Sequence, residues 1–285
     1  MEQAQMKNNI ALLINPLPGK KRIHVANEII KALSERKISF TSFSSTWPAD
    51  INMYKEAWVI GGDGTLNYFL NFYKNIQIPI AIFKAGTGND FAWKLYGEKS
   101  IIEQLDHVLK AVPKQVDAAK CNEHIFINGV GIGFDGEVVK AIKTIRFLGR
   151  HSGYLWVVLQ KIFSFKEYNY HIKFNDQFLA EKFLLVIITN SSRVGGGFMV
   201  SPTADITDGK LNMVLCKPLS VLTRLRNLPV IEKGKHLYKK YILHAEIESV
   251  EIVCDQEIFA HLDGELINRR SFNISVMPKH YLFKY

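Results

Sequence analysis

Two glycine-rich turns, each between an apolar strand-like run and a helix-like run, constrain the fold of this chain most. Residues 59–67 read VIGGDGTLN and residues 83–91 read FKAGTGNDF. Glycines after a buried strand allow positive φ and a close approach of backbone N–H groups to a ligand, and the helix that follows presents a positively polarised N-terminus. Two such turns on neighbouring strands predict a phosphate-binding crevice.

Around these turns, the first 120 residues alternate apolar runs with runs whose apolar residues have helical spacing. This alternation predicts parallel strands with helices on both faces of the sheet, and a ligand at the carboxyl ends of the strands. The predicted strands are residues 10–14, 38–43, 57–60 and 78–83, and the predicted helices are 25–33, 66–73, 90–96 and 101–112.

The pattern changes beyond residue 120. A basic helical stretch over about 137–165 precedes many short runs rich in β-branched and aromatic residues, which predict an antiparallel, sandwich-like or barrel-like second domain. These runs are residues 168–174, 183–189, 211–215, 241–253, 258–262, 272–276 and 281–285. We place the boundary near 118–125, which gives an α/β domain over 1–120 and a β-rich domain over 121–285.

Composition narrows the class of protein. The 285 residues are 47% hydrophobic and 22% charged, which is typical of a globular chain and excludes a disordered one. The longest apolar run, residues 183–188, is far shorter than the roughly 18 residues of a spanning helix, and the polar N-terminus predicts a cytoplasmic protein. The three cysteines lack metal-site spacing and are predicted to be buried, reduced thiols.

The net charge of +9 is concentrated in two segments. Residues 138–173 and 217–240 each contain seven basic residues and one acidic residue. The first segment includes Arg146 and Arg150, and the second includes Arg224 and Arg226. Two interpretations remain open, solvated helix faces or a surface for an anionic partner such as nucleic acid or a phospholipid leaflet.

Carboxylates lie within the glycine turns. Asp63 occupies the middle of the first turn, where it would repel phosphate unless a cation such as magnesium bridged the two. Asp90 follows the second turn, and Asp117 ends the next extended run. The alternative interpretation of Asp63 is a helix cap in a tight turn.

Five motifs together resemble the diacylglycerol kinase catalytic-domain family. They are GGDGTLN at 61–67, GTGNDFA at 86–92, GVGIGFDGEV at 129–138, GGGFMVSPTADITDGKL at 195–211 and HLDGE at 261–265. The likeness is greatest to soluble bacterial lipid kinases, with sphingosine kinases and NAD kinases as more distant relatives. It implies an ATP-dependent lipid kinase that transfers the γ-phosphate to a hydroxyl of diacylglycerol or a related membrane lipid, with ATP between the two domains.

The resemblance also assigns roles to residues. Asp263 matches the proposed general base, Glu265 matches its acidic neighbour, and Asp63 is shared between catalysis and metal binding; a carboxylate base suits a hydroxyl that attacks phosphorus. The alternative interpretation of residues 263–265 is a hairpin turn. The expected nucleotide-binding residues are Asn15, Gly62, Gly64, Thr65, Gly86, Thr87, Gly88 and Asn89. The expected magnesium-linked residues are Asp63, Asp90, Asp117 and Asp208.

Two departures and two alternatives accompany this assignment. Asn212 stands where relatives often have aspartate, which puts a structural magnesium in doubt, and Trp93 stands where arginine is common.

The alternative functions are an NAD kinase and a nucleotide-binding regulatory or lipid-carrying protein without turnover. Expected partners are a membrane lipid substrate and, reversibly, the anionic inner membrane surface. Nucleic acid is not expected because no recognition module is present, and a homodimer is left open.

Overall fold

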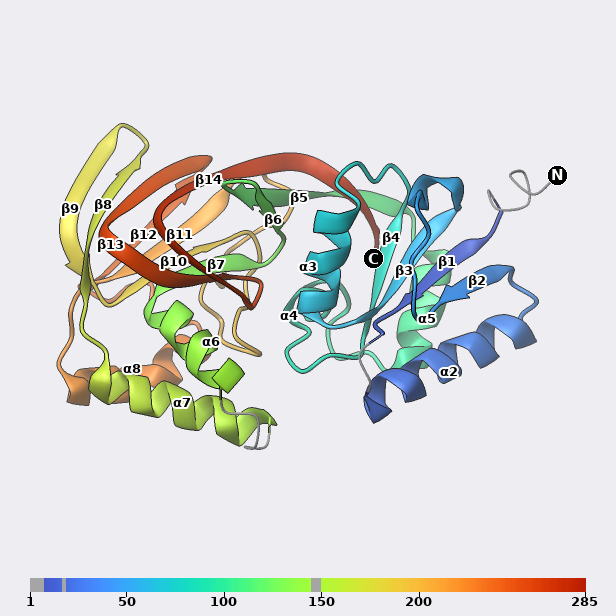
Figure 1. Cartoon of the computed structure of the whole chain (residues 1–285), viewed down its shortest axis with the longest axis horizontal. Helices are drawn as coiled ribbons and strands as arrows, with labels where there is room; N and C mark the ends of the chain where they lie inside the picture. The colour runs from blue at the N-terminus through green and yellow to red at the C-terminus, as the bar shows by residue number, and fades with distance from the viewer. Residues whose placement is uncertain (1–7, 17–18, 145–149) are drawn as a thin grey trace. The chain divides into compact units, whose positions relative to one another are not determined.

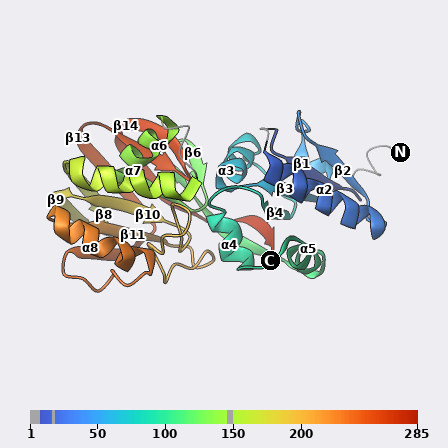
Figure 2. The ribbon, with the colours of Figure 1, turned by 90° about the horizontal axis from the view of Figure 1, so that it is seen from below.

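The computed structural model describes residues 8–16, 19–144 and 150–285, and the chain forms two compact units (Figures 1 and 2). Unit 1 comprises Met1–Asp117 and Lys279–Tyr285, and unit 2 comprises Ala118–Pro278. The last seven residues, which we assigned to the second domain from sequence, thus pack with unit 1.

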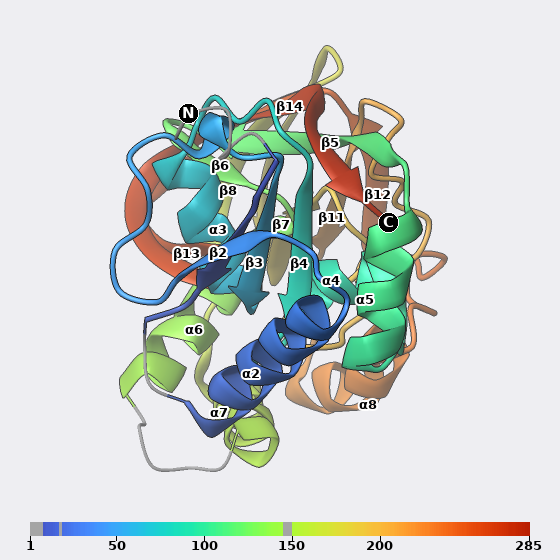
Figure 3. The same ribbon diagram turned by 90° about the vertical axis from the view of Figure 1, so that its right-hand side faces the viewer.

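Unit 1 contains a parallel sheet in the strand order β2-β1-β3-β4-β14. Figure 3 shows α2 and α5 on one face of the sheet and α3 on the other, as the sequence predicted. The strands are β1 (Ile10–Ile14), β2 (Phe40–Phe43), β3 (Glu56–Gly61), β4 (Ile80–Lys84) and the end of β14 (Glu265–Lys284). The helices are α2 (Lys20–Glu35), η1 (Ile51–Met53), α3 (Asp63–Phe72), α4 (Asp90–Tyr96) and α5 (Ile101–Lys110).

The apolar strands of unit 1 form its core. All six residues of β3 are buried, and the Trp58 ring packs on Phe83 of β4 with ring centroids 5.3 Å apart. At the end of β14, Phe283 packs on Phe91, and the Lys284 ammonium lies 3.0 Å from the Glu56 carboxylate in a buried ion pair. This pair and the aromatic contact hold the C-terminal strand in unit 1.

Unit 2 is an antiparallel, sandwich-like β structure, as predicted. Its longest path is β12-β11-β10-β7-β13-β14. The first half of β13 pairs with β8 and its second half pairs with β7. Between the two halves, the pairing of β13 with β14 shifts register between Val253 and Ile258. Two layers therefore enclose one apolar core. The strands are β5 (Pro113–Cys121), β6 (His124–Phe126), β7 (Gly129–Gly133), β8 (Tyr168–Phe174), β9 (Gln177–Phe183), β10 (Leu185–Thr189), β11 (Leu211–Cys216), β12 (Ile242–Ile247) and β13 (Ser249–Leu262).

Three helices pack on the strands of unit 2. They are α6 (Phe134–Thr144), α7 (Arg150–Ser164) and α8 (Val221–Glu232). Val158 and Ile162 of α7 join Leu184 and Cys216 in an apolar cluster beneath these helices. The predicted helical stretch over about 137–165 corresponds to α6 and α7. Residues 272–276 and 281–285 were predicted as two strands, but residues 272–276 and 281–284 both belong to β14.

The thiols agree with the sequence analysis. Cys121, Cys216 and Cys254 are buried and free, and burial raises the pKa of each to about 12. Within the described ranges, no helix has both the length and the apolar character needed to cross a membrane.

Candidate functional site

The two glycine turns of unit 1 pack directly against each other. β3 and β4 are parallel neighbours with Gly61 opposite Lys84, and the Ala85 N–H donates a hydrogen bond to the Gly61 carbonyl at 2.9 Å. A Cβ atom built on Gly86 would lie 2.3 Å from the Gly62 Cα, and one built on Gly62 would lie 2.7 Å from the Gly86 Cα. Only glycine fits at these two positions, which bring the backbone of both turns together at the carboxyl ends of the strands.

Asn89 fixes the shape of the second turn. Its φ of 54° is left-handed, a conformation in which asparagine is enriched. Its Oδ1 accepts the Gly86 N–H at 2.8 Å, and its Nδ2 donates to the Gly86 carbonyl at 3.0 Å. Asn89 is buried, whereas Thr87 is exposed and Gly88 is partly exposed. Of the predicted nucleotide-binding residues in this turn, Asn89 thus has a clear structural function.

Asn15 connects the end of β1 to the first turn of α3. Its Nδ2 donates a 2.6 Å hydrogen bond to Oγ1 of buried Thr65. Gly64 lies between Asp63 and Thr65 in the same helical turn. The structure therefore brings together Asn15, Thr65 and both glycine turns at one edge of the sheet.

The first turn of α2 adds two cations that the sequence analysis missed. Arg22 Nη1 donates to Asn15 Oδ1 at 3.4 Å, and Lys21 Nζ donates to the Gly86 carbonyl at 3.4 Å. The sequence contained a signal for them, because Gly19 and three successive basic residues follow the strand that ends at Ile14. Lys21 and Arg22 thus lie at the same edge of the sheet as Asn15 and the second glycine turn.

Asp63 caps a helix, but not the helix that it begins. Its Oδ2 accepts the Asp90 N–H and its Oδ1 accepts the Phe91 N–H, both at 3.0 Å. These two N–H groups belong to the first turn of α4. The Asp63 carboxylate therefore joins the start of α3 to the start of α4, and Asp90 is buried there.

Two other predicted metal-linked carboxylates, Asp117 and Asp208, accept hydrogen bonds from backbone N–H groups. Asp117 is fully buried, and its Oδ1 accepts the Lys279 N–H at 2.6 Å. Asp208, in unit 2, accepts the Lys210 N–H at 2.9 Å. Over residues 8–16, 19–144 and 150–285, no three His, Cys, Asp or Glu side chains form a group suited to a metal ion. The assignment of Asp63, Asp90, Asp117 and Asp208 to magnesium stays a prediction.

Asn212, the departure noted in the sequence, has a defined partner. It is buried on β11, and its Oδ1 lies 3.0 Å from Nε2 of His244 on β12. Burial lowers the pKa of His244, so the neutral imidazole is favoured there. An asparagine paired with a neutral histidine occupies this position without adding charge to the interior.

Asp263 lies in the hairpin turn between β13 and β14, where Leu262 pairs with Glu265. Its carboxylate accepts three backbone N–H groups, from Ile127 at 2.8 Å and from Asn128 and Gly129 at 2.9 Å. The φ of Asp263 is 48°, and its own N–H donates to the Gly129 carbonyl at 3.0 Å. The hairpin interpretation is therefore correct, and the carboxylate is also held rigidly against the β6–β7 connection.

A histidine and a second aspartate lie beside this hairpin. His261 Nδ1 accepts the Gly264 N–H at 3.3 Å, which leaves the ring proton on Nε2, 3.7 Å from the Asp135 carboxylate. A Cβ atom on Gly131 would lie within 2.7 Å of both side chains, so this glycine makes room for the pair. Asp135 was not singled out from sequence, although it lies in the motif at 129–138. Glu265 is exposed and pairs with Lys143 at 3.1 Å.

Comparison with known proteins assigns both parts of the chain. The family model described as the YegS C-terminal NAD kinase beta sandwich-like domain matches residues 128–282, more than half of the chain. The model of the diacylglycerol kinase catalytic domain matches residues 9–121. The first match covers most of unit 2 and the second covers most of unit 1.

Individual relatives agree with these matches. A diacylglycerol kinase of Bacillus subtilis (strain 168) is 23% identical over 272 residues, which cover 89% of this chain and 88% of that protein. The crystal structure of a diacylglycerol kinase from Bacillus anthracis (strain Sterne) is similar in fold with a TM-score of 0.70, at 21% identity, over 98% of this chain and 97% of that chain. An NAD kinase from Archaeoglobus fulgidus in complex with ATP has a TM-score of 0.56, at 14% identity, over 97% of this chain and 93% of that chain.

These two structures show a shared fold, and the family matches go further. The chain belongs to the family described by the YegS C-terminal NAD kinase beta sandwich-like domain, with a diacylglycerol kinase catalytic domain matched over residues 9–121.

Proposed function

We propose that this protein is an ATP-dependent lipid kinase that transfers the γ-phosphate of ATP to a hydroxyl of diacylglycerol or a related membrane lipid. The observation that carries the proposal is the backbone contact between Gly62 and Gly86 at the carboxyl ends of two parallel strands. Membership of the family supports the kinase chemistry, and the name of the Bacillus subtilis relative supports the acceptor.

The nucleotide would bind along the glycine turns of unit 1. Phosphate groups are stabilised by backbone N–H groups and by the positive end of a helix, and α3 begins directly after Gly62. Lys21 and Arg22 would add positive charge on the opposite side of the turns, and Asn15 with Thr65 would supply side-chain polar groups. The proposed nucleotide-binding set therefore consists of Asn15, Gly62, Gly64, Thr65 and residues 86–89, extended by Lys21 and Arg22.

Magnesium fits this proposal as an ion that arrives with ATP. Such an ion takes most of its ligands from phosphate and water and needs one or two carboxylates. A carboxylate oxygen has two lone pairs, so accepting one N–H bond does not prevent cation binding. Asp63 is the carboxylate we assign to the ion, and Asp90 and Asp117 are further candidates. The ion would neutralise charge on the phosphates.

In unit 2, Asp263 would accept the proton of the lipid hydroxyl as it attacks phosphorus. A general base must keep its orientation, and the three N–H bonds from residues 127–129 give the Asp263 carboxylate that rigidity. Glu265, paired with Lys143, would contribute to the charge around the acceptor. His261 and Asp135 lie beside this hairpin and are further polar groups for an incoming headgroup.

A lipid acceptor is favoured over NAD by the apolar interior of unit 2. A cavity of about 50 Å³ lies between α7, α8 and strands β10–β12, and its lining includes Val158, Ile162, Leu184 and Leu228. An apolar lining of this kind suits part of a hydrocarbon chain better than a nicotinamide or adenine. Because the acceptor lies in a bilayer, we also propose reversible contact with the anionic inner surface of the membrane.

A phosphate-transfer panel tests this function. Purified protein is incubated with γ-labelled ATP and magnesium against diacylglycerol, monoacylglycerol, ceramide, sphingosine, phosphatidylglycerol and NAD, each offered separately. Label in a lipid product supports the proposal. Label in NAD alone would establish the NAD kinase alternative, and ATP binding without transfer to any acceptor would establish the regulatory or lipid-carrying alternative.

A further inference from the structure

We propose that the outward faces of α7 and α8, together with the loop that follows α8, form one surface that docks on an anionic phospholipid bilayer. The reason for docking rests on the proposed function, since a lipid kinase must reach an acceptor within the bilayer. The surface itself rests on the exposure and pairing of individual side chains in unit 2. Those data also decide which basic residues of the two charged segments take part.

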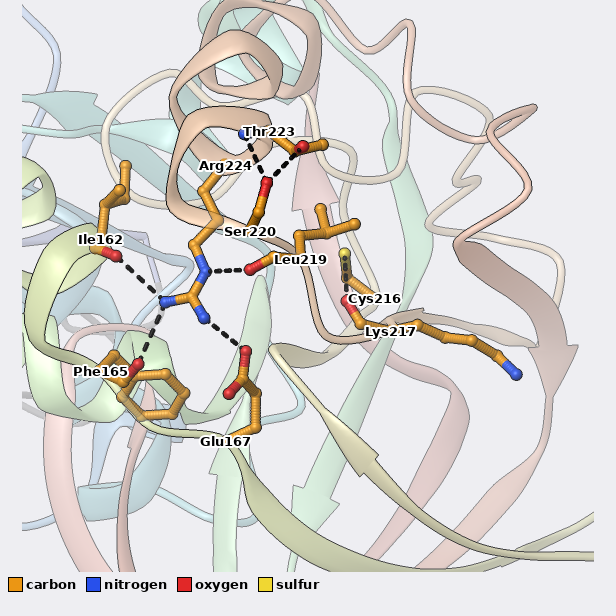
Figure 4. Close-up of polar contacts among 9 residues, drawn as sticks. All are labelled: Ile162, Phe165, Glu167, Cys216, Lys217, Leu219, Ser220, Thr223 and Arg224. Carbon is orange, nitrogen blue, oxygen red and sulfur yellow. Dashed lines mark hydrogen bonds and ion pairs between the residues drawn. The ribbon is translucent and has the colours of Figure 1, made fainter.

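Arg224 is not part of the surface, because it holds α7 and α8 together from within (Figure 4). Its Nη1 donates to the carbonyls of Ile162 and Phe165 at 3.1 Å, and its Nη2 forms an ion pair with Glu167. Its Nε donates to the Leu219 carbonyl at 2.9 Å, and its side chain is only 9% exposed. Arg224 therefore joins the end of α7 to the start of α8.

The buried faces of the two helices define which sides point outward. Val158 and Ile162 of α7 and Leu225 and Leu228 of α8 pack in the same apolar cluster. The opposite sides of both helices must then face away from the sheet, and Figure 2 shows α7 and α8 side by side on the same side of unit 2. Three large apolar side chains occupy these outward sides: Trp156 is 52% exposed, Phe163 64% and Leu222 57%.

Exposed cations lie on α8 and in the loop that follows it. Arg226 of α8 and Lys233, the residue that follows α8, are exposed, and Glu232 is the single acid in residues 221–240. The loop after α8 adds exposed Lys235, Lys239 and Lys240, next to Tyr238, which is 94% exposed. Across the part of the chain that the structure describes, none of these five cations forms an ion pair, whereas Lys161 pairs with Glu137 and Lys217 pairs with Glu181.

Apolar and basic side chains on one face fit a bilayer better than they fit nucleic acid. Each Lys or Arg near an anionic leaflet gains about 1 kcal/mol, and aromatic side chains favour the boundary between headgroups and hydrocarbon. Phe163 and Leu222 have no hydrogen-bonding group, so a sugar-phosphate backbone offers them little, while hydrocarbon removes them from water. Arg146 lies outside the described residues, as does the side chain of Arg150, and neither enters the proposal.

Vesicle sedimentation tests the surface directly. The full chain is mixed with vesicles of phosphatidylcholine alone or with about 30% phosphatidylglycerol, at about 0.1 M and about 0.5 M salt, because salt screens charge within a few ångströms at the higher value. We expect binding to the anionic vesicles at low salt. The double variant Arg226→Glu/Lys233→Glu should bind them roughly 30-fold more weakly or worse, since two attractions of about 1 kcal/mol are lost. Trp156→Ser/Phe163→Ser should lose the binding that remains at high salt.

The matched control is Lys55→Glu/Lys120→Glu, which reverses the same number of exposed charges on residues that belong neither to α7 and α8 nor to the loop after α8. It should bind like the wild type, and thermal melting monitored by circular dichroism confirms that each variant is folded. An equal loss of vesicle binding in Arg226→Glu/Lys233→Glu and in this control would overturn the proposal. Binding that does not depend on anionic lipid would also overturn it, as would preferential binding of an oligonucleotide. Kinase activity on detergent-dispersed diacylglycerol is measured in parallel. Absent activity with intact vesicle binding would refute the proposed function alone.

Discussion

The α-carbons of Gly62 and Gly86 approach so closely that a methyl group on either residue would overlap the other, at 2.7 Å and 2.3 Å. This contact joins the turns after β3 and β4 and leaves their backbone, rather than side chains, at the edge of the sheet. Asp63 and Asn89 hold the two turns from either side through hydrogen bonds to backbone N–H groups. We therefore expect the nucleotide site to be sensitive to atoms added at this contact.

Gly86→Ala should separate the two turns and weaken ATP binding by at least about tenfold, or ~1.4 kcal/mol. Its Cβ would overlap the backbone, which cannot rotate away as a flexible side chain can. The control is Gly97→Ala, which adds the same methyl group without a steric contact. Gly97 has a φ of 62°, but no atom lies within 4 Å of a Cβ built on it. Titration calorimetry with ATP measures both. Unchanged affinity in Gly86→Ala would remove the turn contact from the nucleotide site.

Asp63→Asn should lower both stability and magnesium-dependent ATP binding. An amide supplies one acceptor where the carboxylate supplies two, so an N–H group at the start of α4 loses its partner at a cost of about 1–3 kcal/mol. Asp106→Asn is the control, since Asp106 forms a half-exposed ion pair with Arg36 and should cost less than about 1 kcal/mol. Urea denaturation reports stability, and ATP titration with and without magnesium reports binding. Equal ATP affinity in Asp63→Asn and wild type with magnesium present would exclude the ion role.

Asp263→Asn should reduce turnover by at least the roughly 10²-fold typical of a lost general base, with ATP affinity nearly unchanged. It should also destabilise unit 2 by about 1–3 kcal/mol, because the amide nitrogen would face a backbone N–H from residues 127–129. Asp176→Asn is the control for a turn aspartate at positive φ, since Asp176 has a φ of 60° and is exposed. Steady-state kinetics on folded enzyme decides the point: near-normal turnover would leave Asp263 with a structural role only.

Acid should destabilise the fold through His236. Burial lowers the pKa of His236 below 6.5, so below about pH 6.5 the unfolded chain binds a proton that the folded chain does not. The free energy of unfolding should fall as the pH drops below about 6.5, by up to ~1.4 kcal/mol per pH unit for this histidine. Above about pH 7.5, this histidine should make no contribution to the pH dependence. His236→Gln should flatten part of the slope, and exposed His24→Gln should not. Urea denaturation across this pH range compares the two, and parallel slopes would contradict the prediction.

Local residue patterns were enough to predict the larger features of the fold. Strand–helix alternation before residue 120 and short β-rich runs after it correspond to the two units. The glycine turns were predicted on neighbouring strands, because glycines directly after an apolar run indicate a tight turn at the end of a buried strand. The C-terminal strand was misplaced for a physical reason: the ion pair of Lys284 with Glu56 joins residues 228 positions apart, and no local pattern encodes it.

The roles of individual carboxylates could be predicted only in part. A helix cap was the alternative interpretation of Asp63, but the N–H groups that donate to its carboxylate belong to α4, a contact that exists only after β3 and β4 pair. The three N–H bonds to Asp263 come from residues about 135 positions earlier, so sequence showed the hairpin and not the anchor. Arg224 illustrates the same limit, because its charge suggested a surface while its partners bury it.

The central claim is that the chain transfers phosphate from ATP to a membrane lipid, and one measurement addresses it most directly. Wild-type protein and Gly86→Ala are given γ-labelled ATP, magnesium and diacylglycerol in mixed micelles, with NAD in a parallel reaction, and the labelled products are separated and identified. Our account predicts labelled phosphatidic acid from the wild type, much less from Gly86→Ala, and no labelled NADP. Labelled NADP without any labelled lipid would contradict it.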